Sequence, residues 1–101
     1  MQYEVVTDRD SLRIVLANDL SLHDTDRFAE VLNKAQNSNT NRCQVDFSRL
    51  DQIDSSGLRM LLLLYGVCRK IGSALSFHSA GGQVRDMLIN SRFETIVPVE
   101  A

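Results

Sequence analysis

The sequence predicts an α/β domain with the element order ββαβαβαβ, in which helices cover a mostly parallel sheet with one antiparallel strand. Two observations indicate this class. Two strand-like segments open the chain, and segments with helical periodicity then alternate with short β-branched or aromatic segments. The chain has 101 residues, of which 44% are hydrophobic and 24% charged. This composition is typical of a soluble globular protein, and the length predicts one domain over residues 1–101.

A β-hairpin is expected at the start of the chain. Residues 3–7 and 12–16 have the alternation and β-branched content of strands, and the polar residues 8–10 connect them. This hairpin provides the antiparallel strand of the sheet. The later strands are separated by helices, and right-handed crossovers between them make those strands parallel.

The first helix is expected to begin at Ser21 and to run to about Gln36. Ser21 has the character of an N-cap, and Asp24 three residues later occupies the position of a capping box. Apolar side chains then recur at the spacing of one helical stripe: Phe28, Val31, Leu32 and Ala35. The helix should therefore pack against the sheet through this stripe.

The remaining elements follow the same alternation. Strands are expected at 43–47, 74–77 and 95–97, with a polar connection between residue 47 and the next helix. The second helix begins at Ser55 or Ser56, with Asp54 or Ser55 as its cap, and Gly72 is its stop signal. The third helix spans about 81–90. Its inner face is expected to carry the side chains Val84, Met87 and Leu88.

The second helix is apolar on two faces rather than one. One stripe consists of Leu58, Leu61, Leu62, Tyr65 and Cys68, and another consists of Met60, Leu63, Leu64, Val67 and Ile71. Such a helix is either deeply buried or keeps one face for a partner. Because full burial is difficult in a small domain, this pattern favours a partner surface close to Ser56.

Composition argues against several classes of function. The net charge is −2, from 11 basic and 13 acidic residues, so no basic surplus is available for nucleic acid. No apolar run approaches the roughly 20 residues that span a bilayer, so membrane insertion is not expected. Cys43 and Cys68 are expected to be buried free thiols, which suits a cytoplasmic protein. Neither the cysteines nor the distant His23 and His78 provide metal-ligand spacing.

The two serines at the start of the second helix are the main candidate site. The first N–H groups of a helix lack helical partners, and together with the helix dipole they favour an anion such as a phosphoryl group. The simplest alternative is a helix start with no further role. No metal or other cofactor is expected, although three weaker alternatives remain: a Ser56–His78–Asp54 triad, a cation held by Asp46, Asp51 and Asp54, and an anion at Gly81-Gly82.

The central segment resembles the STAS family, whose members include bacterial anti-sigma factor antagonists. The resemblance rests on Val45-Asp46-Phe47-Ser48 and on Asp54-Ser55-Ser56-Gly57-Leu58, which match a strand ending in Asp-Leu-Ser and an Asp-Ser-Ser-Gly-Leu helix start. The ββαβαβαβ order extends it over nearly the whole chain. One departure is Asn18-Asp19-Leu20-Ser21, where the family often has Gly-x-Leu-Asp.

The resemblance implies a regulatory binding protein rather than an enzyme. In the family, the second serine of this motif, Ser56 here, is phosphorylated by a GHKL-type serine kinase that is usually the anti-sigma factor itself, and a PP2C-type phosphatase removes the phosphate. The unphosphorylated form binds the kinase. Asp54, Ser55 and Gly57 would shape the site, and the docking residues would be Ser21, Leu58, Arg59, Met60 and Leu61.

Two alternatives to anti-sigma antagonism remain within this family. The same switch could act on a target unrelated to sigma factors, such as a regulator of exopolysaccharide or biofilm production. The chain could instead be a constitutive STAS subunit of a lipid-transport or stressosome complex, with no switch at Ser56.

Overall fold

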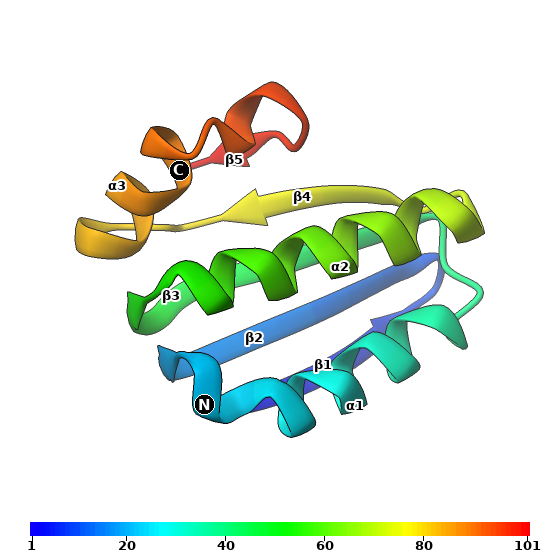
Figure 1. The fold of residues 1–101 in the computed structure, drawn as a ribbon. Helices are drawn as coiled ribbons and strands as arrows, with labels where there is room; N and C mark the ends of the chain where they lie inside the picture. The colour runs from blue at the N-terminus through cyan, green and yellow to red at the C-terminus, as the bar shows by residue number, and fades with distance from the viewer.

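The computed structural model describes residues 1–101 and has the predicted α/β architecture (Figure 1). Five strands form one sheet in the order β1-β2-β3-β4-β5, so the strands lie side by side in chain order. Only β1 and β2 are antiparallel, and every other neighbouring pair is parallel. The predicted hairpin and the mostly parallel sheet are therefore confirmed.

The strands are β1 (Gln2–Asp8), β2 (Ser11–Leu20), β3 (Arg42–Ile53), β4 (Ala74–His78) and β5 (Val99–Glu100). The α-helices are α1 (Thr25–Gln36), α2 (Ser55–Ile71) and α3 (Gly82–Asn90). Two short 3-10 helices lie at Leu22–Asp24 and Phe93–Thr95.

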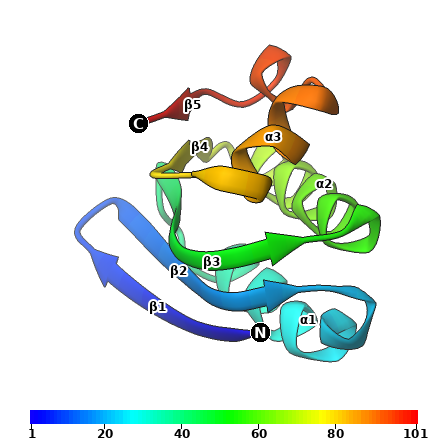
Figure 2. The same ribbon diagram turned by 90° about the vertical axis from the view of Figure 1, so that its left-hand side faces the viewer.

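Helices α1 and α2 lie against one face of the sheet, and the opposite face has no helix over it (Figure 2). The core fills the space between these layers. Phe77 on β4 lies at its centre, with its ring 5.1 Å from that of Phe47 in an edge-to-face arrangement and 5.6 Å from that of Phe93. The stripe predicted for α1 supplies Phe28, Val31 and Ala35 to the core, and Leu32 packs at its margin.

Strand β3 is longer than the sequence predicted. The polar residues after Phe47 were expected to form a connection, but they extend the strand to Ile53. This extension pairs with the second half of β2 rather than with β4, through a register that shifts at two irregularities. Leu50 and Ile53 are buried in it, while the polar side chains between them are exposed. This half of β3 pairs with a neighbour on one edge only and keeps its polar side chains exposed. Its sequence therefore lacks the pattern that predicts a buried strand.

The last strand was also misplaced by the sequence prediction. Residues 95–97 do not form a strand; Phe93–Thr95 is a 3-10 helix, and β5 begins only at Val99. Burial of Phe93 and Val97 turns the backbone inward here, and the Pro98 carbonyl then accepts a hydrogen bond from the Phe77 N–H at 2.8 Å. Long-range packing and pairing therefore accompany the 3-10 turn that replaces the expected strand.

Both cysteines are free and buried, as predicted. A hydrogen bond with Cys68 and burial together raise the pKa of the Cys43 thiol above its usual value, so this thiol stays protonated at neutral pH. No helix of the structure has the length and apolar character needed to cross a membrane.

Candidate functional site

The start of α2 is fixed by Asp54, which connects three segments of the chain. Its Oδ1 accepts a hydrogen bond from the Gly57 N–H at 2.8 Å, which caps the helix, and its Oδ2 accepts one from the Leu22 N–H at 3.3 Å. Its own N–H donates to the Leu20 carbonyl at 3.2 Å. Because these bonds join the ends of β2 and β3 to α2, they hold the first turn of the helix in place.

Gly57 is required where α2 passes over β2. A Cβ atom at this position would lie 2.6 Å from the Leu20 carbonyl oxygen and 2.6 Å from Cγ1 of Ile53. Carbon atoms are not tolerated at such distances, and one of the two contacts is backbone. Only glycine therefore allows α2 to begin this close to the ends of the two strands.

Ser55 and Ser56 occupy the first two positions of α2. Ser55 is exposed and Ser56 is half-buried, and neither hydroxyl makes a hydrogen bond within the chain. Their backbone N–H groups belong to the helix end that lacks helical acceptors. The Asp54 carboxylate accepts the N–H of the third position, Gly57. The N–H groups of Ser55 and Ser56 are left available to an added group.

A groove of about 550 Å³ adjoins this helix start. It lies between the ends of β2 and β3 and the first part of α3, and its apolar lining consists of Leu20, Ile53 and Met87. Ser21 and Ser55 also line it, and so do the carboxylates of Asp19 and Asp54. Ser21, a predicted docking residue, thus lies at the same groove as Ser55.

Two features shape the loop before α1: a positive φ at Asn18, near the end of β2, and the hydrogen bonds between Ser21 and Asp24. Asn18, which stands where the family often has glycine, has a φ of 71°, a conformation that asparagine tolerates better than most residues. The Ser21 N–H and the Ser21 hydroxyl both bond to Asp24 Oδ2, at 2.8 and 3.3 Å. The predicted pairing of Ser21 with Asp24 is confirmed, although the first turn there is a 3-10 helix.

Gln83 on α3 is a site residue that the sequence did not reveal. Its side-chain amide accepts a hydrogen bond from the Ile53 N–H at 2.9 Å and donates one to the Ile53 carbonyl at 2.8 Å. The Gln83 side chain therefore bonds both backbone groups of Ile53 on the edge of β3 that β4 does not reach, as a neighbouring strand would. No spacing rule predicts this contact, because residues 53 and 83 are joined only by the fold.

The predicted docking residues divide into two groups. Met60 and Leu61 are buried in the core, with 5% and 0% of their surface exposed, so the expectation that they contact a partner is corrected. Leu58 is half-buried and Arg59 is exposed. The leucines that do face solvent are Leu22, just before α1, and Leu62 and Leu63, in the middle of α2, with exposures of 64%, 48% and 55%.

The cation site considered for Asp46, Asp51 and Asp54 does not assemble. Asp46 forms an ion pair with Arg13, and its Oδ1 accepts a hydrogen bond from the Ser48 N–H at 2.8 Å. Burial acts to raise the pKa of Asp46, but the bonds from Ser48 and Arg13 outweigh it and lower the pKa below its usual value. No group of three or more His, Cys, Asp and Glu residues is arranged to hold a metal ion.

The proposed triad is also separated in the structure. His78 Nε2 lies 2.8 Å from the Ser76 hydroxyl and 3.5 Å from Glu100 Oε2. His78 lines a cavity of about 210 Å³ whose lining includes neither Ser56 nor Asp54. His78 therefore has partners of its own and takes no part in the site at the start of α2.

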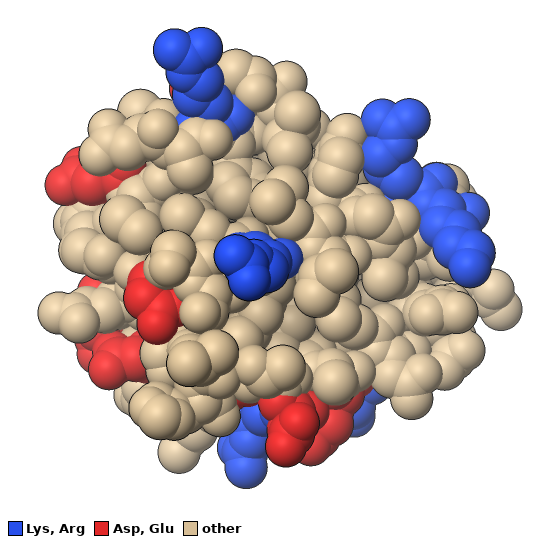
Figure 3. Space-filling view, viewed as in Figure 1, with Lys and Arg blue, Asp and Glu red and all other residues tan.

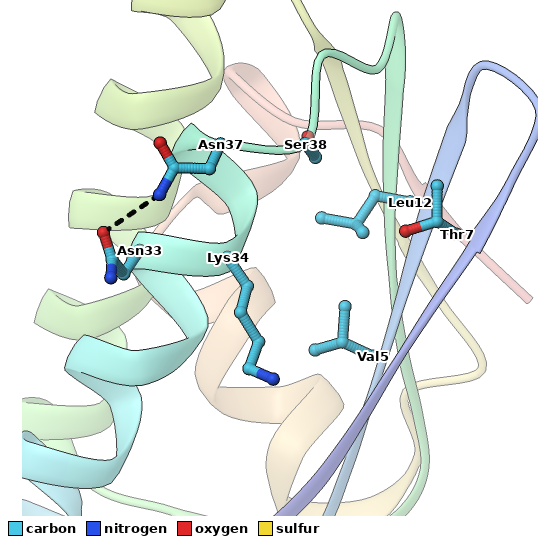
Figure 4. A pocket seen from close by; sticks show the side chains of 7 residues that line it. All are labelled: Val5, Thr7, Leu12, Asn33, Lys34, Asn37 and Ser38. Atoms are coloured by element: carbon cyan, nitrogen blue, oxygen red, sulfur yellow. Dashed lines mark hydrogen bonds between the residues drawn. The ribbon is translucent and has the colours of Figure 1, made fainter.

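A further groove of about 460 Å³ lies between the β1–β2 hairpin and the end of α1 (Figure 4). Lys34 and Thr7 point toward it, and on its rim the Asn37 amide donates to Asn33 Oδ1 at 3.3 Å. It holds neither a carboxylate nor a histidine, so it offers no pair of groups for acid–base chemistry.

Comparison with protein families decides the classification. A family model described as "Mlab, STAS domain" matches residues 4–98, which is nearly the whole chain. The chain belongs to the STAS domain family. The segment that suggested this family, from Val45 to Leu58, therefore lies within a match that includes β2, β3, β4 and most of β1 and ends just before β5. No curated protein matches the chain in sequence.

Solved structures share this STAS fold at low sequence identity. An anti-sigma factor antagonist from Mycobacterium paratuberculosis superposes with a TM-score of 0.87 at 12% identity, covering 98% of this chain and 84% of that one. The Bacillus cell fate determinant SpoIIAA in its phosphorylated form gives 0.74 at 16%, covering 99% and 92%. A sulfate transporter family protein from Wolinella succinogenes gives 0.79 at 17%, covering 94% and 80%. Because these proteins differ in description, the likeness establishes the fold alone.

Proposed function

We propose that this chain is a phosphorylation-controlled binding switch without enzymatic activity of its own, and that Ser56 is the residue modified. The observation that carries the proposal is the position of Ser56. Its hydroxyl has no partner within the chain, it stands at the second position of a rigidly capped helix, and exposed leucines follow it on the same helix. A group added there changes the charge of a surface that is otherwise suited to protein contact.

Ser56 is favoured over Ser55 by the helical spacing. Residues three, seven and ten positions after Ser56 are Arg59, Leu63 and Gly66, all exposed, so these positions follow one another along one face of α2. Ser55 instead lines the groove beside α3. A phosphate on Ser56 therefore lies at one end of the exposed helix face, where it meets a bound partner directly.

The switch would act on binding rather than on folding. A phosphoserine carries about −1.5 to −2 charges at neutral pH. The N-terminus of α2 tolerates this charge, since helix dipoles and free N–H groups favour anions by roughly 0.3–1 kcal/mol at exposed sites. A partner that covers the leucines must instead desolvate the phosphate, which costs several kcal/mol when the charge is not paired.

The proposed partners follow from the family. A GHKL-type serine kinase of the anti-sigma type would bind the unmodified chain and phosphorylate Ser56, and a PP2C-type phosphatase would reverse the modification in the cytoplasm. The structural relative SpoIIAA, which has been solved in unphosphorylated and phosphorylated forms, supports the expectation that one fold accommodates both states.

Affinity capture from the native host tests this proposal. Tagged wild-type, Ser56→Ala and Ser56→Asp chains are used as baits, and the retained proteins are compared by quantitative mass spectrometry. A serine kinase of the GHKL fold should be enriched on the first two baits and lost from the third. Retention of one set of proteins by all three baits would contradict the switch and favour a constitutive subunit of a larger assembly.

A further inference from the structure

Gly66 lies on the exposed face of α2, and nothing in the fold requires a glycine there. A Cβ atom at this position would have no heavy atom within 4 Å, and the backbone is an ordinary right-handed helix. Glycine destabilises a helix interior relative to alanine because it loses more backbone entropy on folding. Gly57, in the same helix, is required by close packing inside the chain, whereas Gly66 is not.

The neighbours of Gly66 on this face are apolar. Leu62 and Leu63 precede it by four and three positions, so both side chains lie one turn away on the same side of the helix. They are 48% and 55% exposed, although leucine is usually buried in a domain of this kind. With no side chain at Gly66, the helix backbone is bare beside these two exposed leucines, and we call this gap between the side chains of α2 the hollow.

The charges around this hollow have one sign. Helix α2 carries Arg59, Arg69 and Lys70 and not a single acidic residue, although the chain as a whole has a net charge of −2. None of the three forms an ion pair with a carboxylate; Arg69 instead donates a hydrogen bond to the Tyr65 hydroxyl at 3.1 Å. Figure 3 shows this face, with blue atoms over α2 and the red atoms toward its edges.

We propose that this face of α2, consisting of Arg59, Leu62, Leu63, Gly66 and Lys70, binds a helix of a partner protein whose small apolar stripe is flanked by carboxylates. The inference rests on the proposed function and names the chemistry of the partner. Gly66 lets the two helix backbones approach closely, because the distance between packed helices is set by the side chains at their contact. The flanking cations select acidic neighbours and reject basic ones.

The proposal also explains how a phosphate on Ser56 would act at a distance from the hollow. Arg59 is three positions after Ser56, on the same face, and is within reach of a phosphate there. The phosphate would then occupy one of the cations that attract the partner and would add like charge facing the partner's carboxylates. Binding is therefore lost through charge as well as through desolvation.

A pair of helical peptides tests this surface without relying on the cellular partner. Each has about 20 residues, enough to form a helix once bound, and the same alanine–leucine stripe; one is flanked by glutamates and the other by lysines. They are titrated into the ¹⁵N-labelled chain and followed by NMR. The glutamate peptide should shift the amide resonances of Leu62, Leu63 and Gly66, and the lysine peptide should not.

Variants localise the contact. Gly66→Leu adds a side chain at an exposed position where a Cβ meets no atom within 4 Å, and it should abolish the shifts, whereas Ala29→Leu, on the exposed face of α1, should retain them. Arg59→Gln combined with Lys70→Gln should remove the preference for the glutamate peptide. Absence of shifts with the glutamate peptide, equal shifts with both peptides, or unchanged binding by Gly66→Leu would each overturn the inference. None of these outcomes depends on whether Ser56→Asp weakens binding of the captured kinase, so this inference and the proposed switch can fail separately.

Discussion

Replacing Gly57 by alanine is expected to lower the free energy of unfolding by roughly 1–3 kcal/mol or more, the usual cost of overpacking a well-packed core. The added Cβ would lie 2.6 Å from the Leu20 carbonyl oxygen. That oxygen cannot simply retreat, because it accepts the hydrogen bond from the Asp54 N–H. Relief of the clash therefore disturbs the cap of α2, and chemical denaturation followed by circular dichroism measures the cost.

Gly66→Ala is the matched control for this substitution. It makes the same change in the same helix, but its Cβ meets no atom within 4 Å. Alanine should stabilise the helix here by up to about 1 kcal/mol. The two variants are therefore expected to move the unfolding midpoint in opposite directions. If Gly57→Ala were as stable as the wild-type chain, the close approach of α2 to the strand ends would be contradicted.

Ser56→Asp is expected to weaken binding of the captured kinase at least about 100-fold, while Ser56→Ala keeps the affinity of the unmodified chain. The carboxylate must be desolvated against the partner, and a loss of about 2.8 kcal/mol corresponds to this factor. Isothermal titration calorimetry with the purified kinase gives both dissociation constants.

The control for this comparison is the stability of the variants. Because the Ser56 side chain makes no hydrogen bond and lies at a helix N-terminus, both substitutions should unfold close to the wild-type midpoint. Ser55→Asp adds the same charge one position earlier, toward the groove beside α3, and should weaken binding of the kinase less than Ser56→Asp does. Equal affinities of Ser56→Asp and Ser56→Ala would contradict the proposed switch.

The order of the elements could be predicted because it follows from local patterns. Alternation, the helical stripe of α1 and the stop at Gly72 each depend on residues that are close in the sequence, and each is present in the structure. The second half of β3 could not be predicted in this way, since its polar residues pair with β2 at positions about 30 residues earlier. A strand was predicted at 95–97, but Phe93 packs against Phe77 and the segment Phe93–Thr95 forms a 3-10 helix instead.

The site shows the same division. The cap at Asp54 and the two serines are a short motif, so their place at the helix start followed from the sequence. The docking side chains did not, because α2 has two apolar stripes and the protein core covers part of each, namely Leu61 and Cys68 of one and Met60 and Leu64 of the other. The structure exposes Leu62 and Leu63 and buries Met60 and Leu61. The signals in the sequence that mark the exposed side are Gly66 in the middle of the helix and the cations Arg59 and Lys70 in line with it.

Phosphopeptide mapping of this chain isolated from its native host tests the central claim most directly. The protein is purified under several growth conditions, and intact-mass and fragmentation spectra locate any phosphate between Asp54 and Arg59. We expect one phosphate on Ser56, in a fraction that changes with growth conditions. Complete coverage of this segment without phosphate under any condition, or phosphate confined to Ser55, would contradict the assignment of Ser56 as the switch.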